Sequence, residues 1–130
     1  LEDRLVAMGV AYVSFALEHP TTYQLMFGSV LGDFSDHKEL SEAAEQSYQR
    51  LLDVLVEVIA ERPEWDMSVI KLGSIVWSAV HGIASVLLFR LTKGERSPDF
   101  KVAQSMNALA ADPQTAVRVL MRGVVEGPHR

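Results

Sequence analysis

The sequence contains no cysteine among its 130 residues. This absence excludes disulfide bonds, thiolate metal sites and a cysteine nucleophile, so the fold must be stabilised by packing. The sequence also lacks the alternation of apolar and polar residues that is typical of strands, and it has no internal repeat. The expected fold class is therefore all-α, a bundle of about five to seven helices.

Charge is missing from residues 72–89. This window reaches the lower edge of the length that a bilayer requires. It also contains serines and glycines, and no aromatic belt or basic cluster flanks it. The N-terminal residues are charged at once, unlike a signal peptide. We expect a packing helix at 72–89, no membrane partner and a cytoplasmic protein.

Basic residues are fewer than acidic ones, 12 against 17, which gives a net charge of −5. Such a surface repels a phosphate backbone on average, and no helix carries a cluster of arginines and lysines. We therefore expect no direct contact between this chain and nucleic acid. Apolar residues make up 48% and charged residues 22%, and residues 1–130 are predicted to form a single domain.

Motifs typical of enzymes are also missing. The sequence lacks the two Glu-x-x-His motifs that di-iron helix bundles carry, and it has no glycine-rich phosphate loop and no Gly-x-Ser-x-Gly elbow. Asp33, Asp36 and His37 are close enough in sequence to gather around a metal, but a solvated loop is the preferred interpretation. We expect no enzymatic activity, no cofactor and no metal site.

Helical spacing of apolar residues, together with start and stop signals, predicts the helices. Pro20 ends the first helix and opens the second, Asp66 is expected to cap the fourth, and Asp112 with Pro113 starts the last. A capping box at Asp36 is expected to start the third. The predicted helices span residues 1–19, 20–28, 37–62, 67–94, 101–110 and 113–127.

Small residues form a stripe along the helix that contains residues 72–89. They fall at helical spacing, so another helix can approach closely there. The helix is apolar on a second side as well, and one small domain rarely has enough layers to cover both. We predict a homodimer in which this helix and the last helix meet their copies. The predicted interface residues are Ser78, Gly82, Ser85, Val117, Leu120, Met121 and Val124. The alternative is that both helices complete the core of one chain.

Three segments resemble the C-terminal domain of TetR-like transcriptional regulators. They are Trp77-x-x-x-His81-Gly82, the stretch "SFALEHPTTYQLMF" at 14–27 and the closing "VLMRGVVEG". The resemblance covers about residues 11–127. It implies a domain that dimerises and holds an effector pocket, while a helix-turn-helix domain N-terminal to it binds operator DNA. We expect that DNA-binding domain to be absent from this chain.

Aromatic and flexible side chains with few charges around them indicate an effector pocket. We place it between the first helix, the long helix from Leu40 and the first half of the helix that bears Trp77. Tyr23 belongs to the same aromatic set. The predicted ligand-binding residues are Tyr12, Phe15, Met26, Phe27, Tyr48, Leu52, Trp77 and His81.

His81 itself is interpreted either as a hydrogen-bonded core residue or as a polar contact in this pocket. The expected function is that of the sensor and dimerisation module of a TetR-like repressor, which binds a small apolar or aromatic effector. Two alternatives stay open, namely a structural dimerisation domain without a ligand and a helical enzyme.

Overall fold

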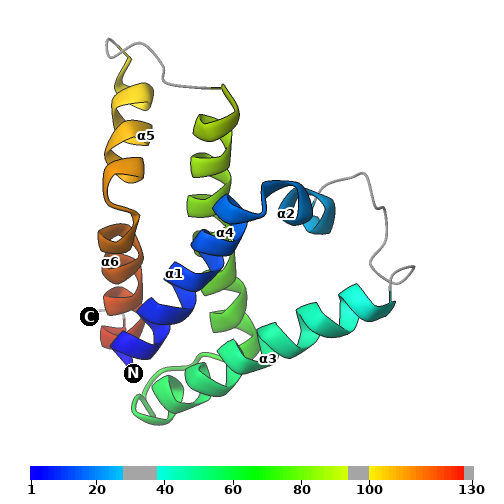
Figure 1. Cartoon of the computed structure of the whole chain (residues 1–130). Coiled ribbons are helices and arrows are strands. Elements are labelled where there is room, and N and C mark those ends of the chain that lie inside the picture. Colours follow the sequence, from blue (N-terminus) through cyan, green and yellow to red (C-terminus); the bar gives the residue numbers. More distant parts are fainter. Residues whose placement is uncertain (28–37, 94–99, 128–130) are drawn as a thin grey trace.

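The computed structural model describes residues 1–27, 38–93 and 100–127, except the side chains of residues 25–27, 38, 40, 41 and 93. Within these ranges it contains helices and no strand, which confirms the all-α fold class (Figure 1). The helices are α1 (Glu2–Glu18), α2 (Pro20–Phe27), α3 (Lys38–Ala60), α4 (Val69–Lys93), α5 (Lys101–Ala111) and α6 (Pro113–Glu126).

The ends of several helices follow the sequence signals. Pro20 is the first residue of α2, and Pro113 is the first residue of α6. The Asp112 side chain accepts a hydrogen bond from the Thr115 backbone N–H at 3.1 Å, which is the predicted cap. Gly127 ends α6 with a φ of 75°, a conformation that glycine adopts without strain.

The start of α4 differs from the prediction. Asp66 was expected to cap this helix, but α4 begins at Val69, and the Ser68 hydroxyl accepts the Lys71 backbone N–H at 3.1 Å. Turn hydrogen bonds from Trp65 and Met67 hold the chain in a non-helical path up to Ser68. The predicted Asp66 cap is therefore wrong, and the predicted Asp36 cap lies outside the described residues.

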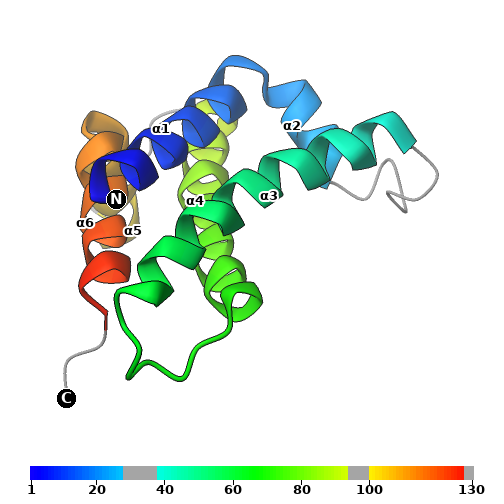
Figure 2. The same cartoon turned by 90° about the horizontal axis from the view of Figure 1, so that it is seen from below.

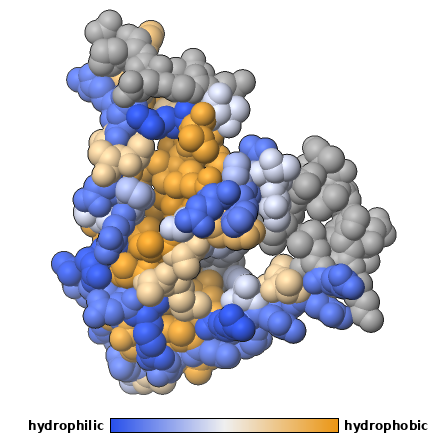
Figure 3. Space-filling view, viewed as in Figure 1, coloured by the Kyte–Doolittle hydropathy of each residue, from blue (hydrophilic) through white to orange (hydrophobic). Residues whose placement is uncertain are grey.

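The core lies mainly between α1, α3, α4 and α6. α1 crosses α4, α5 and α6 run along α4, and α3 approaches α4 near its start (Figures 1 and 2). Hydrophobic residues gather in the seam between α4 and the α5–α6 segment (Figure 3). The largest fully buried side chains come from α1, α3, α4 and α6 and are Leu5, Leu55, Val58, Val76, Val117 and Met121.

α1 and α6 approach each other closely at Gly9. A Cβ atom at this position would lie 2.6 Å from Cγ1 of Val117 and 3.2 Å from Cε of Met121. Such distances leave no room for any side chain, so the missing Cβ allows the two helices to pack at this separation. The Val117 and Met121 side of α6 is therefore covered closely by α1.

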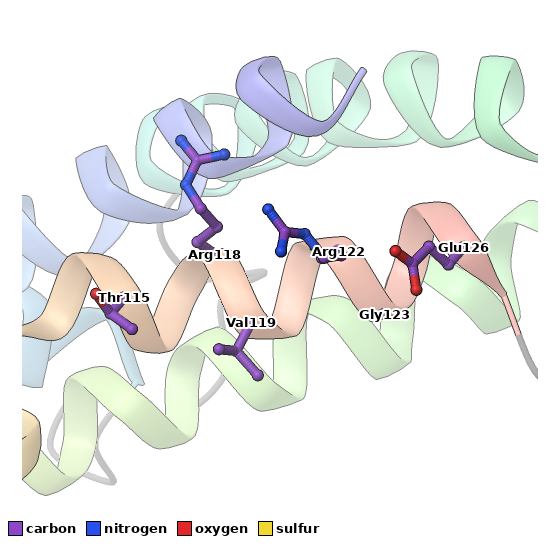
Figure 4. A pocket seen from close by; sticks show the side chains of 6 residues that line it. All are labelled: Thr115, Arg118, Val119, Arg122, Gly123 and Glu126. Atoms are coloured by element: carbon purple, nitrogen blue, oxygen red, sulfur yellow. The ribbon is translucent and has the colours of Figure 1, made fainter.

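Ion pairs hold the start of α1 against two other helices. Glu2 bonds Arg118 at 2.8 Å and Arg122 at 3.1 Å on α6, and Arg4 bonds Glu57 on α3 at 2.9 Å. Arg118 and Arg122 both point from α6 towards α1 (Figure 4). Water screens these exposed pairs, so they add little to stability, and their main effect is to orient the helices.

α4 is long and apolar enough to cross a membrane, judged by length and composition alone, over Val69–Thr92. In the folded chain, 39% of its most apolar window is buried. Core helices of soluble proteins meet the same criteria, so this property is weak evidence for a membrane span.

Candidate functional site

Three polar side chains from three helices meet beside the core. Tyr12 on α1 lies with its Oη 3.2 Å from Oη of Tyr23 on α2 and 3.1 Å from Nδ1 of His81 on α4. Tyr23 Oη is also hydrogen-bonded to His81 Nδ1. The residues are separated by up to 69 positions in the sequence. This triangle therefore ties α1, α2 and α4 together at one point.

Trp77 and Ser85 extend the triangle along α4, one turn on either side of His81. The Trp77 and Tyr23 rings each stack with the His81 ring, with centroid distances of 5.2 and 5.5 Å. Trp77 lies close enough to Tyr12, and Ser85 close enough to Tyr23, to lower the pKa of the neighbouring hydroxyl. We call these five residues the Tyr–His cluster.

Burial shifts the pKa values of the titratable residues in this cluster, so that their uncharged forms are favoured. Loss of water contact raises the pKa of both Tyr12 and Tyr23, although the polar groups of Trp77 and Ser85 beside them oppose the shift. The same loss of water contact lowers the pKa of His81 from its ordinary 6.5. At pH 7 the cluster therefore presents neutral hydroxyl, imidazole and indole groups, which can donate and accept hydrogen bonds but carry no charge.

Tyr48 and Leu52 form a second contact, between α3 and α4. A Cβ atom at Gly73 would lie 2.6 Å from Oη of Tyr48 and 2.7 Å from Cδ2 of Leu52. Both side chains therefore lie directly over Gly73, one turn before Trp77. α1 and α3 diverge from the Arg4–Glu57 pair, and the surface is hollowed between them (Figures 1 and 3).

The predicted ligand-binding residues fall into three groups. Tyr12, Trp77 and His81 lie together in the Tyr–His cluster, and Tyr48 and Leu52 lie over Gly73. Phe15 is 39% exposed, and its ring lies against His19 with centroids 5.3 Å apart. Met26 and Phe27 are at the end of α2, and their side chains lie outside the described residues.

The predicted set of binding residues missed two cluster members, namely Ser85, which was predicted to lie at the interface, and Tyr23. Tyr23 was recognised only as part of the aromatic set, yet it is 3% exposed and contacts both Tyr12 and His81. The sequence offers one clue to its role, because Tyr23 lies in the first turn of the helix that Pro20 starts. The direction in which α2 leaves α1 determines the contact, and this direction is not encoded in any local pattern.

The predicted interface residues of α6 are divided between core and surface. Val117, Met121 and Val124 are buried in the core of the chain itself, against α1 and α4. Their assignment to a subunit interface is corrected, because a side chain that is already covered has no surface to offer a partner. Leu120 is partly buried against the same core. The apolar stripe on α6 was predicted correctly, but it packs within the chain.

The opposite side of α6 is open. Val119 is 69% exposed, and a Cβ atom at Gly123 would meet nothing within 4 Å. A shallow groove follows this surface, and Val119 points away from the side that carries Arg118 (Figure 4). The groove is lined by Thr115, Arg118, Val119, Arg122, Gly123 and Glu126.

α4 has an open side as well. Ser78 and Gly82 are exposed there, and a Cβ atom at Gly82 would meet nothing within 4 Å. Helical spacing places exposed Ile75, Val86 and Phe89 on the same side. Ser85 is exposed too, but it lies beside Tyr23 in the Tyr–His cluster. We call the exposed sides of α4 and α6 together the outer face.

The part of the chain that the structure describes contains no group of three His, Asp or Glu residues placed to hold a metal ion. Asp33, Asp36 and His37 lie outside the described residues.

The sequence matches one family model, described as tetracyclin repressor-like, C-terminal domain, over residues 5–112. No match was found among curated proteins or among solved structures. The family model covers α1 from Leu5 on and all of α2, α3, α4 and α5, including the whole Tyr–His cluster. The chain therefore belongs to the family of tetracyclin repressor-like C-terminal domains, which confirms the resemblance found in its sequence.

Proposed function

We propose that this chain is the sensor and dimerisation module of a TetR-like transcriptional repressor in the cytoplasm. In this proposal a small apolar or aromatic effector binds between α1, α3 and α4, and two chains associate through the outer face. Operator DNA is bound by a helix-turn-helix domain N-terminal to these residues, and the present residues contact no DNA. The chain performs no catalysis and uses no cofactor.

The observation that carries this proposal is the Tyr–His cluster. Polar side chains cost free energy when they are removed from water, and a helix junction of this kind is packed more simply with aliphatic residues. Tyr12, Trp77 and His81 are only partly buried, so part of each side chain remains accessible to a small molecule. Aromatic walls with a few converging polar groups are typical of small-molecule sites.

The dimer proposal rests on the two glycines of the outer face. A glycine inside a helix lowers helix stability by about 1 kcal/mol relative to alanine. Gly82 and Gly123 lie within α4 and α6, and the described part of the chain places no atom near either position. A second backbone that packs against these glycines supplies the compensating contact, and exposed Ile75 and Val119 supply apolar area beside it.

A thermal-shift screen with small apolar and aromatic compounds tests the sensor function. A ligand that binds only the folded chain stabilises it by about 2.7 kcal/mol at a hundredfold excess over Kd, which raises the melting temperature by several degrees. Phe15→Gln and Tyr48→Gln are each expected to abolish this shift while the protein keeps the wild-type mass in light scattering. Phe100→Gln, which changes an exposed aromatic residue on the other side of the chain, is the matched control and should keep the shift.

Two results would contradict the sensor function. If no compound shifts the melting temperature although the protein is a dimer, the structural dimerisation domain without a ligand is the better description. Turnover of a compound, or a stoichiometric metal in elemental analysis, would favour a helical enzyme instead. If both variants keep the full shift, the effector site lies elsewhere.

A further inference from the structure

The last turn of α6 has no cation of its own. Carbonyl groups at the end of a helix lack a partner within the helix, and together they carry a partial negative charge that a basic side chain offsets. The last turn of α6 contains no basic residue. It ends on Glu126, whose carboxylate adds further negative charge at this point. A stable end of α6 therefore needs a donor from elsewhere in the chain.

Arg62 is such a donor. It lies in the connection between α3 and α4, and its Nε and Nη2 atoms donate hydrogen bonds to the Val125 carbonyl oxygen at 3.2 and 2.5 Å. A Cβ atom at Gly127 would lie 3.7 Å from the same Nε, so the guanidinium also covers the residue that ends α6. The Gly127 backbone N–H closes the last turn by donating to the Gly123 carbonyl oxygen at 3.0 Å. Arg62 thus holds this turn from outside the helix.

The backbone around Arg62 is itself held in place. The Arg62 N–H donates to the Ile59 carbonyl oxygen at the end of α3, and the Arg62 carbonyl oxygen accepts the Trp65 N–H, both at 2.9 Å. The side chains of Ile59 and Trp65 pack against the hydrophobic core. Direct contacts therefore join the core, the turn that carries Arg62 and the end of α6.

The turn that Arg62 holds belongs to the outer face. Gly123 and Glu126 both line the groove on the exposed side of α6 (Figure 4). If the last turn frays, Glu126 moves and the backbone around Gly123 loses its helical shape, so the groove changes at this end. Arg62 is not one of the residues that line the groove. It acts on this surface only through the helix end.

We propose that Arg62 is a positioning residue for the dimer, which keeps the last turn of α6 helical and thereby links the connection at 61–68 to the outer face. This proposal rests on the proposed dimerisation and names a residue on which its affinity depends. Such a link is reciprocal. Arg62 strengthens the association of two chains, and their association in turn stabilises the turn around Arg62.

The first experiment measures the helix end without a partner, in a chain kept monomeric by Gly82→Glu and Val119→Glu on the outer face. Arg62→Met in this background should speed the amide hydrogen exchange of the Gly127 N–H, followed by NMR, by about tenfold, the change expected for loss of one charge-assisted hydrogen bond. Arg62→Lys keeps the cation and should restore part of the protection. Arg50→Met, which removes an exposed arginine from α3, is the matched control and should leave this exchange unchanged.

The second experiment measures the dimer itself, by light scattering over a dilution series. Arg62→Met in the otherwise wild-type chain should raise the Kd of the dimer by at least about threefold, because only chains with a helical end associate and both chains need one. Arg62→Lys should raise the Kd less, and Arg50→Met should leave it unchanged.

The third measurement needs only wild-type protein, so it does not depend on how a variant folds. The Trp65 N–H reports on the turn around Arg62 and is not part of the outer face. It should exchange at least about threefold more slowly at concentrations where the chain is dimeric than at concentrations where it is monomeric. In Arg62→Met this difference between dimer and monomer should disappear, which an arginine with a purely local role would not cause.

The outcomes separate the role of Arg62 from dimerisation. If the Gly127 N–H exchanges equally fast with and without Arg62→Met, Arg62 does not hold the helix end and the proposal is wrong. If this exchange changes but the dimer Kd and the Trp65 exchange do not, Arg62 is a local contact and the link to the outer face is wrong. If the wild-type chain is monomeric at all concentrations, the proposed dimerisation fails and the link fails with it, whereas the Gly127 exchange still shows whether Arg62 holds α6.

Discussion

Gly73 and Gly82 are on the same helix, on opposite sides of it, and their surroundings differ completely. A side chain at Gly73 would collide with Tyr48 and Leu52, whereas a side chain at Gly82 would meet nothing within 4 Å. Both glycines weaken α4 by about the same amount. At Gly73 the close approach of α3 compensates for this loss, but at Gly82 the described part of the chain offers no compensation.

The same contrast separates Gly9 on α1 from Gly123 on α6, two helices that pack against each other. Gly9 lets α1 approach Val117, and Gly123 faces open space on the far side of α6. The inner glycines are thus explained by contacts within one chain. The outer glycines, Gly82 and Gly123, share one property, which is that no atom of the described residues would lie within 4 Å of a Cβ atom at either position.

The largest expected effect comes from charge on the outer face. Gly82→Glu combined with Val119→Glu should convert a dimer into a monomer of about 14.4 kDa in light scattering. Carboxylates buried without partners cost several kcal/mol, so the Kd of the dimer should rise at least about a hundredfold. Val56→Glu places the same charge on an exposed apolar position of α3 and should leave the mass unchanged. A wild-type chain that is monomeric at tens of micromolar contradicts the interface.

An intermediate effect is expected from alanine at the two kinds of glycine. Gly9→Ala puts a methyl group into the contact with Val117, and overpacking outweighs the gain in helix propensity. The free energy of unfolding in urea should fall by about 1 to 2 kcal/mol. Gly123→Ala, made in the background of the monomeric Gly82→Glu and Val119→Glu double variant, should instead raise it by up to about 1 kcal/mol. If both alanine variants change the free energy of unfolding in the same direction, the distinction between inner and outer glycines is wrong.

The smallest expected effect concerns pH and the inner side of α4. The folded chain holds the pKa of His81 below the ordinary 6.5, so the unfolded chain takes up a proton first as the pH falls. The stability that neutral His81 confers is therefore fully present above pH 6.5 and is lost as the pH falls towards the folded pKa. The slope should be a fraction of about 1.4 kcal/mol per pH unit, because the ring is partly exposed.

Urea unfolding at several pH values between 5.5 and 7.5 measures this slope. His81→Gln keeps a side chain that hydrogen-bonds but does not titrate, so its stability should depend less on pH than that of the wild type. If the two proteins show the same dependence, other groups cause it, and His81 does not report on the Tyr–His cluster.

Local patterns in the sequence determined the helices and their ends. Pro20 and Asp112 act on residues within one turn of themselves, so their effects can be predicted without knowledge of the fold. Ser68 and Asp66 are both good caps by residue type, and the turn before α4 decided between them. The sequence was also sufficient to recognise the family, through the Trp77 to Gly82 motif and the segments around it.

Only the tertiary structure decided what each helix packs against. The apolar stripe of α6 is visible in the sequence, but hydrophobic periodicity shows which side of a helix is covered and not which element covers it. α1 covers this stripe because Gly9 lets it approach Val117. The contact of Tyr12 with His81 joins residues 69 positions apart. It depends on the crossing of α1 over α4 and on the direction that α2 takes after Pro20, and packing across the whole chain fixes both.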